Sequence, residues 1–154
     1  MTARAPDASA VAAAAAAIGP HIRRTPTEKS EALSGLAGRE VYLKLENLQK
    51  TGSFKIRGAL NALMQMEERR RANGVVTASA GNHGQGVAFA AKLLGVPACV
   101  VLPIGVPLAK LTAIQRAGAE TVLTGESYDE RTRPRSRSRA SGSARTCTPS
   151  TTTT

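Results

Sequence analysis

Three short segments rich in β-branched residues recur at a fixed interval in the second half of the chain, and this rhythm restricts the fold more than any other feature. Residues 75–79, 98–102 and 121–124 begin 23 positions apart. A segment that ends near Gly95 separates the first two, and a segment that begins at Pro107 separates the last two. Strands that alternate with helices over short connections form parallel sheets with right-handed crossovers. The sequence therefore predicts an α/β fold, with a parallel sheet flanked by helices.

The first half of the chain predicts two helices and a strand ahead of this sheet. Asp7 is a good N-cap for a helix over residues 8–18. A short helix is expected over about residues 29–36, and Gly38 is expected to end it. Apolar and polar residues then alternate over residues 41–46, with the period of a strand.

A further helix is expected from Lys55 to about residue 73. Ser53 is placed to accept hydrogen bonds from its first turn, and Glu67 is placed to pair with Arg71 one turn later. A lysine at the positive end of a helix gains nothing from the helix dipole. Two interpretations of this lysine stay open from the residues alone: a solvated surface amine, or an amine that forms a Schiff base.

Residues 79–86 form a glycine-rich turn directly after the first predicted strand of the sheet. In open parallel sheets ligands bind beyond the carboxyl ends of strands, and a helix N-terminus offers free N–H groups to an anion. Ser79, Asn82 and His83 would converge there, and glycines such as Gly81 would let the backbone approach a ligand. The turn predicts a site for an anionic small molecule. The alternatives are a tight connection without a ligand and a histidine satisfied by neighbouring backbone.

Together, residues 43–55 and 79–86 resemble the threonine/serine dehydratases, which belong to the tryptophan-synthase β-like, fold type II family of pyridoxal-phosphate enzymes. The resemblance covers about residues 22–130. It implies that residues 47–130 form the small domain, which carries the cofactor lysine, and that residues 1–46 are the N-terminal segment of the large domain. It also implies that the full-length proteins are homo-oligomers.

The same resemblance implies a role for each candidate site residue. Lys55 would form the Schiff base with pyridoxal 5'-phosphate and act as the catalytic base, while Phe54 and Asn82 would contact the cofactor. No metal ligand is implied. The reaction would be that of an ammonia-lyase, which converts L-threonine or L-serine to a 2-oxo acid and ammonia. The amino-acid substrate would be bound by Ser79, Gly81, Asn82 and His83.

Ala80 separates two activities within the family. Serine racemases place a second serine on the opposite face of the cofactor, directly after the position that matches Ser79. Alanine has no hydroxyl that could donate a proton from that face, so a dehydratase is preferred to a serine or threonine racemase.

The positive charge of the chain is concentrated in residues 131–154. The formal net charge is +10, but these residues hold six arginines and no acid, and without them 15 basic residues face 11 acidic ones, a net charge of +4. With three apolar residues, this tail is expected to be disordered. GC-rich codons for it, read in a shifted frame after Glu130, encode a run of alanines suited to a helix, so we interpret the tail as a frameshift product. The nucleotide sequence tests this interpretation.

Two other interpretations of the chain as written remain. It is either a truncated fragment without activity, or a protein whose Arg-Ser tail binds nucleic acid. The second lacks the aromatic stacking platform that RNA-binding folds provide, since aromatic residues make up 3% of the chain.

The remaining composition favours a cytoplasmic protein with a small-molecule partner. Two cysteines are too few for a disulfide framework, which favours a reducing compartment. No apolar run approaches the roughly 20 residues that cross a membrane, so no membrane association is expected.

Overall fold

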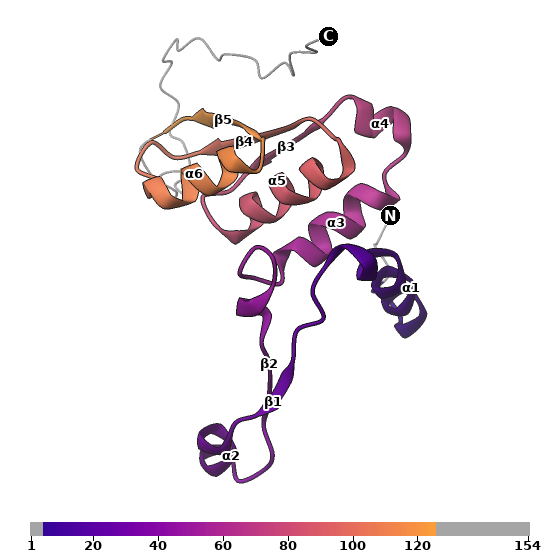
Figure 1. The fold of residues 1–154 in the computed structure, drawn as a ribbon, viewed down its shortest axis with the longest axis vertical. Coiled ribbons are helices and arrows are strands. Elements are labelled where there is room, and N and C mark those ends of the chain that lie inside the picture. The colour runs from indigo at the N-terminus through magenta and orange to yellow at the C-terminus, as the bar shows by residue number, and fades with distance from the viewer. Residues whose placement is uncertain (1–4, 126–154) are drawn as a thin grey trace, which may run out of the picture.

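The computed structural model describes residues 5–125, which form a parallel sheet packed against helices and a hairpin that extends away from it (Figure 1). The basic tail, residues 131–154, lies outside the described residues. In chain order the elements are α1 (Ala8–Ile18), the 3-10 helix η1 (Gly19–His21), β1 (Thr27–Lys29), α2 (Glu31–Ala37), β2 (Tyr42–Lys44), the 3-10 helix η2 (Glu46–Leu48), α3 (Lys55–Gln65), α4 (Glu68–Ala72), β3 (Val75–Ala78), α5 (Asn82–Leu94), β4 (Ala98–Leu102), α6 (Leu108–Arg116) and β5 (Glu120–Leu123).

The three-stranded parallel sheet confirms the predicted fold class. Its strand order is β3-β4-β5, so β4 is central. Val75 lies opposite Ala98, which means that the 23-residue interval is also the register of the first pair. In the second pair Val100 lies opposite Thr121, only 21 positions later, so there the interval and the register differ.

One face of this sheet is covered by α5 and α6 (Figure 1). Val100 and Leu102 of β4 pack with Ala88 of α5 and Ile114 of α6, and all four are almost fully buried. Burial of a large aliphatic side chain contributes about 1.5–3 kcal/mol. On the other face the coverage varies, since Val76 of β3 is 65% exposed and Cys99 of β4 is 6% exposed.

A second cluster of buried residues joins α1, α3 and α5. It includes Ile18, Leu60, Leu63 and Ala90. The two α3 residues are three positions apart, so they lie on the same face of the helix, which is its buried face. The predicted cap of α1 is confirmed as well, because Asp7 Oδ1 accepts a hydrogen bond from the Ala10 N–H at 2.9 Å.

Helix α3 is shorter than predicted. It ends at Gln65, and the backbone is extended at Met66 before α4 begins. The side chain of Met66 packs against the second cluster, and this contact accompanies the break. The predicted ion pair between Glu67 and Arg71 is wrong for the same reason: the break makes Glu67 an N-cap, and its carbonyl accepts the Arg71 N–H at 3.0 Å.

The first half of the chain contains an antiparallel pair, β1 and β2, that was not predicted. Lys29 lies opposite Tyr42. Lys29 therefore ends a strand instead of starting α2, and Ser30 caps that helix by accepting the Leu33 N–H at 3.3 Å. All residues of both strands are exposed, so the alternation over residues 41–46 does not mark a buried face here.

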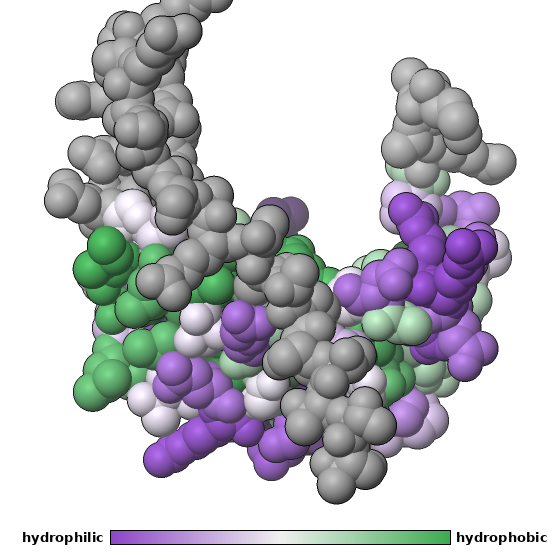
Figure 2. All heavy atoms as spheres, turned by 90° about the horizontal axis from the view of Figure 1, so that it is seen from above, coloured by the Kyte–Doolittle hydropathy of each residue, from purple (hydrophilic) through white to green (hydrophobic). Residues whose placement is uncertain are grey.

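The surface seen from above divides into a hydrophilic and a hydrophobic side (Figure 2). The hydrophilic side is that of α4, which carries Arg69, Arg70 and Arg71. The hydrophobic side is that of α6 and β5, where Ile104 and Leu108 are 62% and 74% exposed. Within residues 5–125, none of the helices has the length and apolar character needed to cross a membrane.

Candidate active site

The predicted site residues lie at the beginnings of two neighbouring helices. Lys55 is the first residue of α3. Ser79 follows β3, Gly81 is the N-cap of α5, and Asn82 and His83 begin α5. The site is therefore at the carboxyl end of a strand of the parallel sheet, as predicted. The side chains of Lys55, Asn82 and His83 are exposed and accessible to a ligand.

Gly86 brings the two helices together. A Cβ atom built on Gly86 would lie 3.1 Å from the Lys55 carbonyl carbon and 3.1 Å from the Ile56 nitrogen. Because those atoms belong to the backbone, a larger residue at this position would require the start of α3 to shift by a few tenths of an ångström. The contact places the backbone of Lys55 beside the second turn of α5, next to the glycine-rich turn.

Two of the three glycines of this turn serve packing within the protein. Gly84 also serves packing, because a Cβ there would lie 2.5 Å from the Ser79 carbonyl oxygen. Gly81 alone of the three glycines opens to space, with nothing within 4 Å of a built Cβ. Close approach of backbone to backbone therefore explains Gly84 and Gly86, and only Gly81 has room for a ligand.

Ser79 is held by two hydrogen bonds, one to β4 and one within the turn. Its N–H donates to the Val101 carbonyl at 3.1 Å, and its Oγ accepts the Gly81 N–H at 3.2 Å. The Ser79 hydroxyl can still donate its own proton, because a hydroxyl accepts and donates at once. The N–H groups of Asn82 and His83 have no partner inside the helix, because they belong to its first turn. The turn thus presents several donors together, which suits an anion.

The start of α3 pairs an amine with an aromatic ring. Lys55 Nζ lies 4.9 Å from the centroid of the Phe54 ring, within cation–π range. The predicted cap by Ser53 is wrong. Phe54 occupies the N-cap position, so Ser53 lies one residue too early, and its buried Oγ has no hydrogen-bond partner among the described residues.

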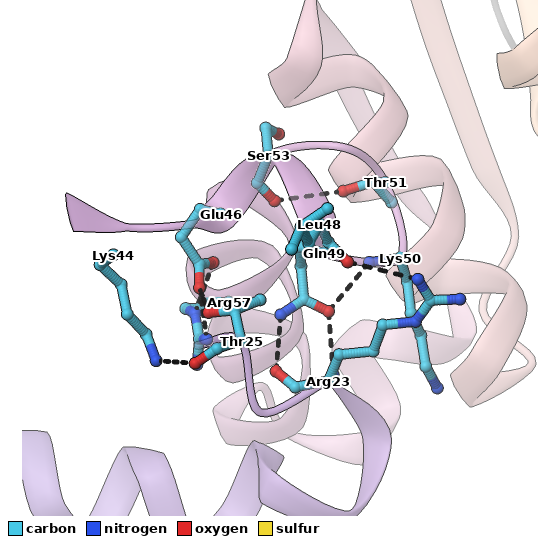
Figure 3. Close-up of polar contacts among 10 residues, drawn as sticks. All are labelled: Arg23, Thr25, Lys44, Glu46, Leu48, Gln49, Lys50, Thr51, Ser53 and Arg57. Carbon is cyan, nitrogen blue, oxygen red and sulfur yellow. Dashed lines mark hydrogen bonds and ion pairs between the residues drawn. The ribbon is translucent and has the colours of Figure 1, made fainter. Parts of the chain in front are cut away.

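A network centred on Glu46 joins the loop before α3 to Arg57 of that helix, and sequence reasoning missed it (Figure 3). Arg57 donates to the carboxylate of Glu46 twice, from Nε to Oε2 at 2.8 Å and from Nη2 to Oε1 at 2.7 Å. Thr25 adds a third bond from Oγ1 at 2.6 Å, and Lys44 donates to the Thr25 carbonyl. The hydrogen bonds from Arg57, more than any other contact, lower the pKa of Glu46 from 4.5 to about 2. The same pairing raises the pKa of Arg57.

Gln49 ties the same loop to the segment before β1. Its Oε1 accepts the N–H of Arg23 at 2.9 Å, and its Nε2 donates to the Arg23 carbonyl at 2.8 Å. Gln49 is 3% exposed, so these bonds are shielded from water. No short-range spacing rule links Glu46 with Arg57, eleven positions later, or Gln49 with Arg23, 26 positions earlier. The sequence offered one signal, which was the presence of polar residues such as Glu46 and Gln49 in the short connection between β2 and α3.

Comparison with known proteins places this geometry in one family. The model of the family described as pyridoxal-phosphate dependent enzymes matches residues 18–151, which extends beyond both ends of the segment for which a resemblance was expected. The L-threonine ammonia-lyase of Thermotoga maritima is 52% identical over 109 residues, which are 71% of this chain and 27% of that protein.

Two solved structures have the same fold over most of this chain. Maize serine racemase has a TM-score of 0.75 at 36% identity, over 82% of this chain and 38% of its own. The processed form of threonine deaminase isoform 2 from Solanum lycopersicum has a TM-score of 0.67 at 35% identity, over 81% of this chain and 36% of its own. This chain therefore spans between a quarter and two fifths of the length of these relatives. The chain belongs to the family of pyridoxal-phosphate-dependent enzymes, with a fold of type II.

Proposed function

We propose that this chain is part of an ammonia-lyase that converts L-threonine or L-serine to a 2-oxo acid and ammonia. The contact at Gly86 carries the proposal, because it sets the amine-bearing start of α3 beside the anion-binding start of α5. The names of the relatives support it, since a protein 52% identical to this chain is an L-threonine ammonia-lyase.

The residues present fit pyridoxal phosphate. Lys55 offers an exposed primary amine, Phe54 an aromatic surface next to it, and Asn82 an exposed amide that can pair with a ring hydroxyl. The open space at Gly81 leaves room for a planar group. Lys55, Phe54 and Asn82 would hold the cofactor, which supplies an electron sink for the substrate's α-carbon when it is bound.

The chain's own residues would bind and deprotonate the substrate. The hydroxyl of Ser79 and the N–H groups of Asn82 and His83 would orient the carboxylate at the N-terminus of α5. The Lys55 amine would then take the proton from the α-carbon and pass it to the β-hydroxyl, which leaves as water. The remaining enamine hydrolyses to the 2-oxo acid and ammonia.

The proposal includes a division of the chain into two parts. Residues 1–46 would belong to the larger domain of the enzyme and residues 47–130 to the smaller one. The separation of the β1–β2 hairpin from the β3–β5 sheet supports this division. On this proposal the complete enzyme would be a homo-oligomer in cytoplasmic amino-acid metabolism.

A serine racemase is the second candidate, because the maize enzyme shares the fold at a TM-score of 0.75. Ala80 argues against it, since the position after Ser79 then lacks a hydroxyl.

The test is the absorbance spectrum of the chain after addition of pyridoxal phosphate, followed by removal of the free cofactor. We expect a band of a protein-bound Schiff base in the wild type, its loss in Lys55→Ala and its retention in Lys50→Ala, a control lysine that is also exposed. A band that persists unchanged in Lys55→Ala would remove Lys55 from the site. Formation of a 2-oxo acid from threonine or serine, measured in the same preparations, then distinguishes a lyase from a racemase.

A further inference from the structure

Arg57 is the residue through which the loop before α3 holds the start of that helix. It stands two positions after Lys55, and its guanidinium meets the carboxylate of Glu46 in η2 with two hydrogen bonds (Figure 3). A bidentate arginine–carboxylate pair fixes orientation as well as distance, because both planar groups must align. The Arg57 backbone takes part too, since its N–H donates to the Phe54 carbonyl at 3.0 Å and closes the first turn.

The pair is enclosed, unlike an ordinary surface ion pair. The side chains of Glu46 and Arg57 are 16% and 32% exposed. Thr25, which is 4% exposed, adds its hydroxyl bond to the same carboxylate. The ion pairs of Lys29 with Glu31 and Glu40 are far more open, with carboxylates 83% and 64% exposed. Exposed ion pairs of that kind restrict the backbone little. Among the three ion pairs of residues 5–125, the Glu46–Arg57 pair is therefore the one able to constrain the backbone.

The opposite side of the same turn is held by α5. Gly86 leaves so little room that a single added carbon would lie 3.1 Å from the backbone atoms of Lys55 and Ile56. The first turn of α3 is thus fixed twice, by an ion pair toward the loop and by backbone contact toward α5. We propose that Arg57, held by Glu46, is the positioning residue that keeps the backbone of Lys55 against α5 and so sets the place of its amine.

This proposal rests on the proposed function, because the position of the Lys55 amine matters only if that amine reacts. Helix ends fray when nothing holds them, and reacting groups tolerate little displacement: a shift of about 1 Å can lower a rate about 100-fold. Loss of the pair should therefore affect the reactivity of Lys55 more than the folding of the chain.

The experiment measures which lysine pyridoxal phosphate modifies. The full chain is mixed with pyridoxal phosphate and reduced with borohydride, and the share of label on Lys55 is determined by peptide mass spectrometry. The variants are Glu46→Gln, Arg57→Gln, the double variant and Arg57→Lys, which keeps the charge but not the planar fork. Glu40→Gln is the matched control, because it breaks an ion pair in the open hairpin.

We expect the labelled share of Lys55 to fall about 10-fold in Glu46→Gln and Arg57→Gln, and no further in the double variant, because the two side chains act as a unit. The labelled share of Lys55 in Arg57→Lys should lie between these values and that of the wild type, and in Glu40→Gln it should equal that of the wild type. Unchanged labelling of Lys55 in Arg57→Gln that is folded by circular dichroism overturns the proposal. Should Arg57→Gln not fold, wild-type labelling in Arg57→Lys overturns it.

Hydrogen exchange of the amides of residues 55–58, measured without cofactor, separates this inference from the proposed function. A wild type that shows no preference for Lys55 contradicts the proposed function of this chain. The positioning role then still stands if those amides exchange faster in Arg57→Gln than in Glu40→Gln, and it fails if the two variants exchange alike.

Discussion

The carboxylate of Glu46 accepts three hydrogen bonds, from Arg57 and Thr25, and its ionised form is therefore favoured in the folded chain. Its pKa falls from 4.5 to about 2 on folding, with the Arg57 hydrogen bonds as the first cause. A carboxyl group with a lowered pKa adds stability that is complete above its unfolded pKa and is lost as the pH falls toward the folded one. The window for this loss runs from about pH 4.5 down to about pH 2.

Glu46→Gln should lower the free energy of unfolding at pH 7 by about 1–3 kcal/mol, between the values for exposed and fully buried pairs. Between pH 4.5 and 2 the difference from the wild type should shrink, because protonation removes the same interaction from the wild type. Denaturant unfolding at pH 7, 4 and 3 measures both effects. The control Glu40→Gln should differ from the wild type by less than about 1 kcal/mol, and an equal loss in both variants would contradict this account.

At the level of single residues the sequence predicted where the candidate site residues lie but not what supports them. Lys55, Asn82 and His83 were expected at helix starts and lie there, because such placement depends on neighbouring residues in the chain. Glu46, Gln49 and Arg57 were not singled out, because their partners are distant in the chain and become neighbours only when the loop folds.

The pair of α3 and α5 forms the rigid part of the candidate site. Two glycines of these helices, which the sequence alone does not distinguish, differ in the space around them. Gly86 of α5 faces backbone atoms of Lys55 and Ile56 at 3.1 Å, whereas Gly58 of α3 has nothing within 4 Å of a built Cβ. Sequence alone could not separate the two, because the contact depends on how the helices cross.

Gly86→Ala should separate the helices and lower the free energy of unfolding by about 1–3 kcal/mol, the usual effect of overpacking. Gly58→Ala, the matched control, should raise it by about 0.5–1 kcal/mol, because alanine favours helix and meets no obstacle there. Thermal or denaturant unfolding of both variants checks the opposite signs. If Gly86→Ala is stabilised as well as Gly58→Ala, the start of α3 can move to make room for the added carbon, and the contact at Gly86 is not a constraint.

The lengths of elements were predicted less well than their types. The parallel strands and α5 were placed almost to the residue, since glycines and prolines mark their ends. The end of α3 was missed because Met66 leaves the helix to reach the second cluster, which is a tertiary contact. The β1–β2 pair was missed because three-residue strands with every side chain exposed carry little periodic signal.

On the scale of the whole molecule, the hairpin formed by β1, α2 and β2 stands apart from the two buried clusters (Figure 1). Its strands are exposed throughout, and two-stranded sheets are marginally stable in water. Val76 of β3, at the edge of the main sheet, is also 65% exposed, although parallel sheets are normally covered on both faces.

Hydrogen exchange should therefore divide the chain into two populations. Amides of residues 27–44 should exchange with little protection, and those of β4 and α5 should be protected close to the global stability, because all of their core residues are at most 9% exposed and most are 0–1% exposed. Exchange followed by peptide mass spectrometry resolves these segments in one sample. Equal protection in both would mean that the hairpin belongs to the same cooperative unit as the sheet.

The backbone contact at Gly86 also affects how the spacing between α3 and α5 can be altered by substitution. Because two main chains meet there without an intervening side chain, backbone contact helps to set the offset between Lys55 and the start of α5. A redesign for longer or shorter amino acids cannot adjust that offset through a side chain at Gly86 without moving backbone, since even a Cβ there would lie 3.1 Å from Lys55 and Ile56. On the proposed function, adaptation to new substrates is therefore expected first in the side chains that flank the reacting groups.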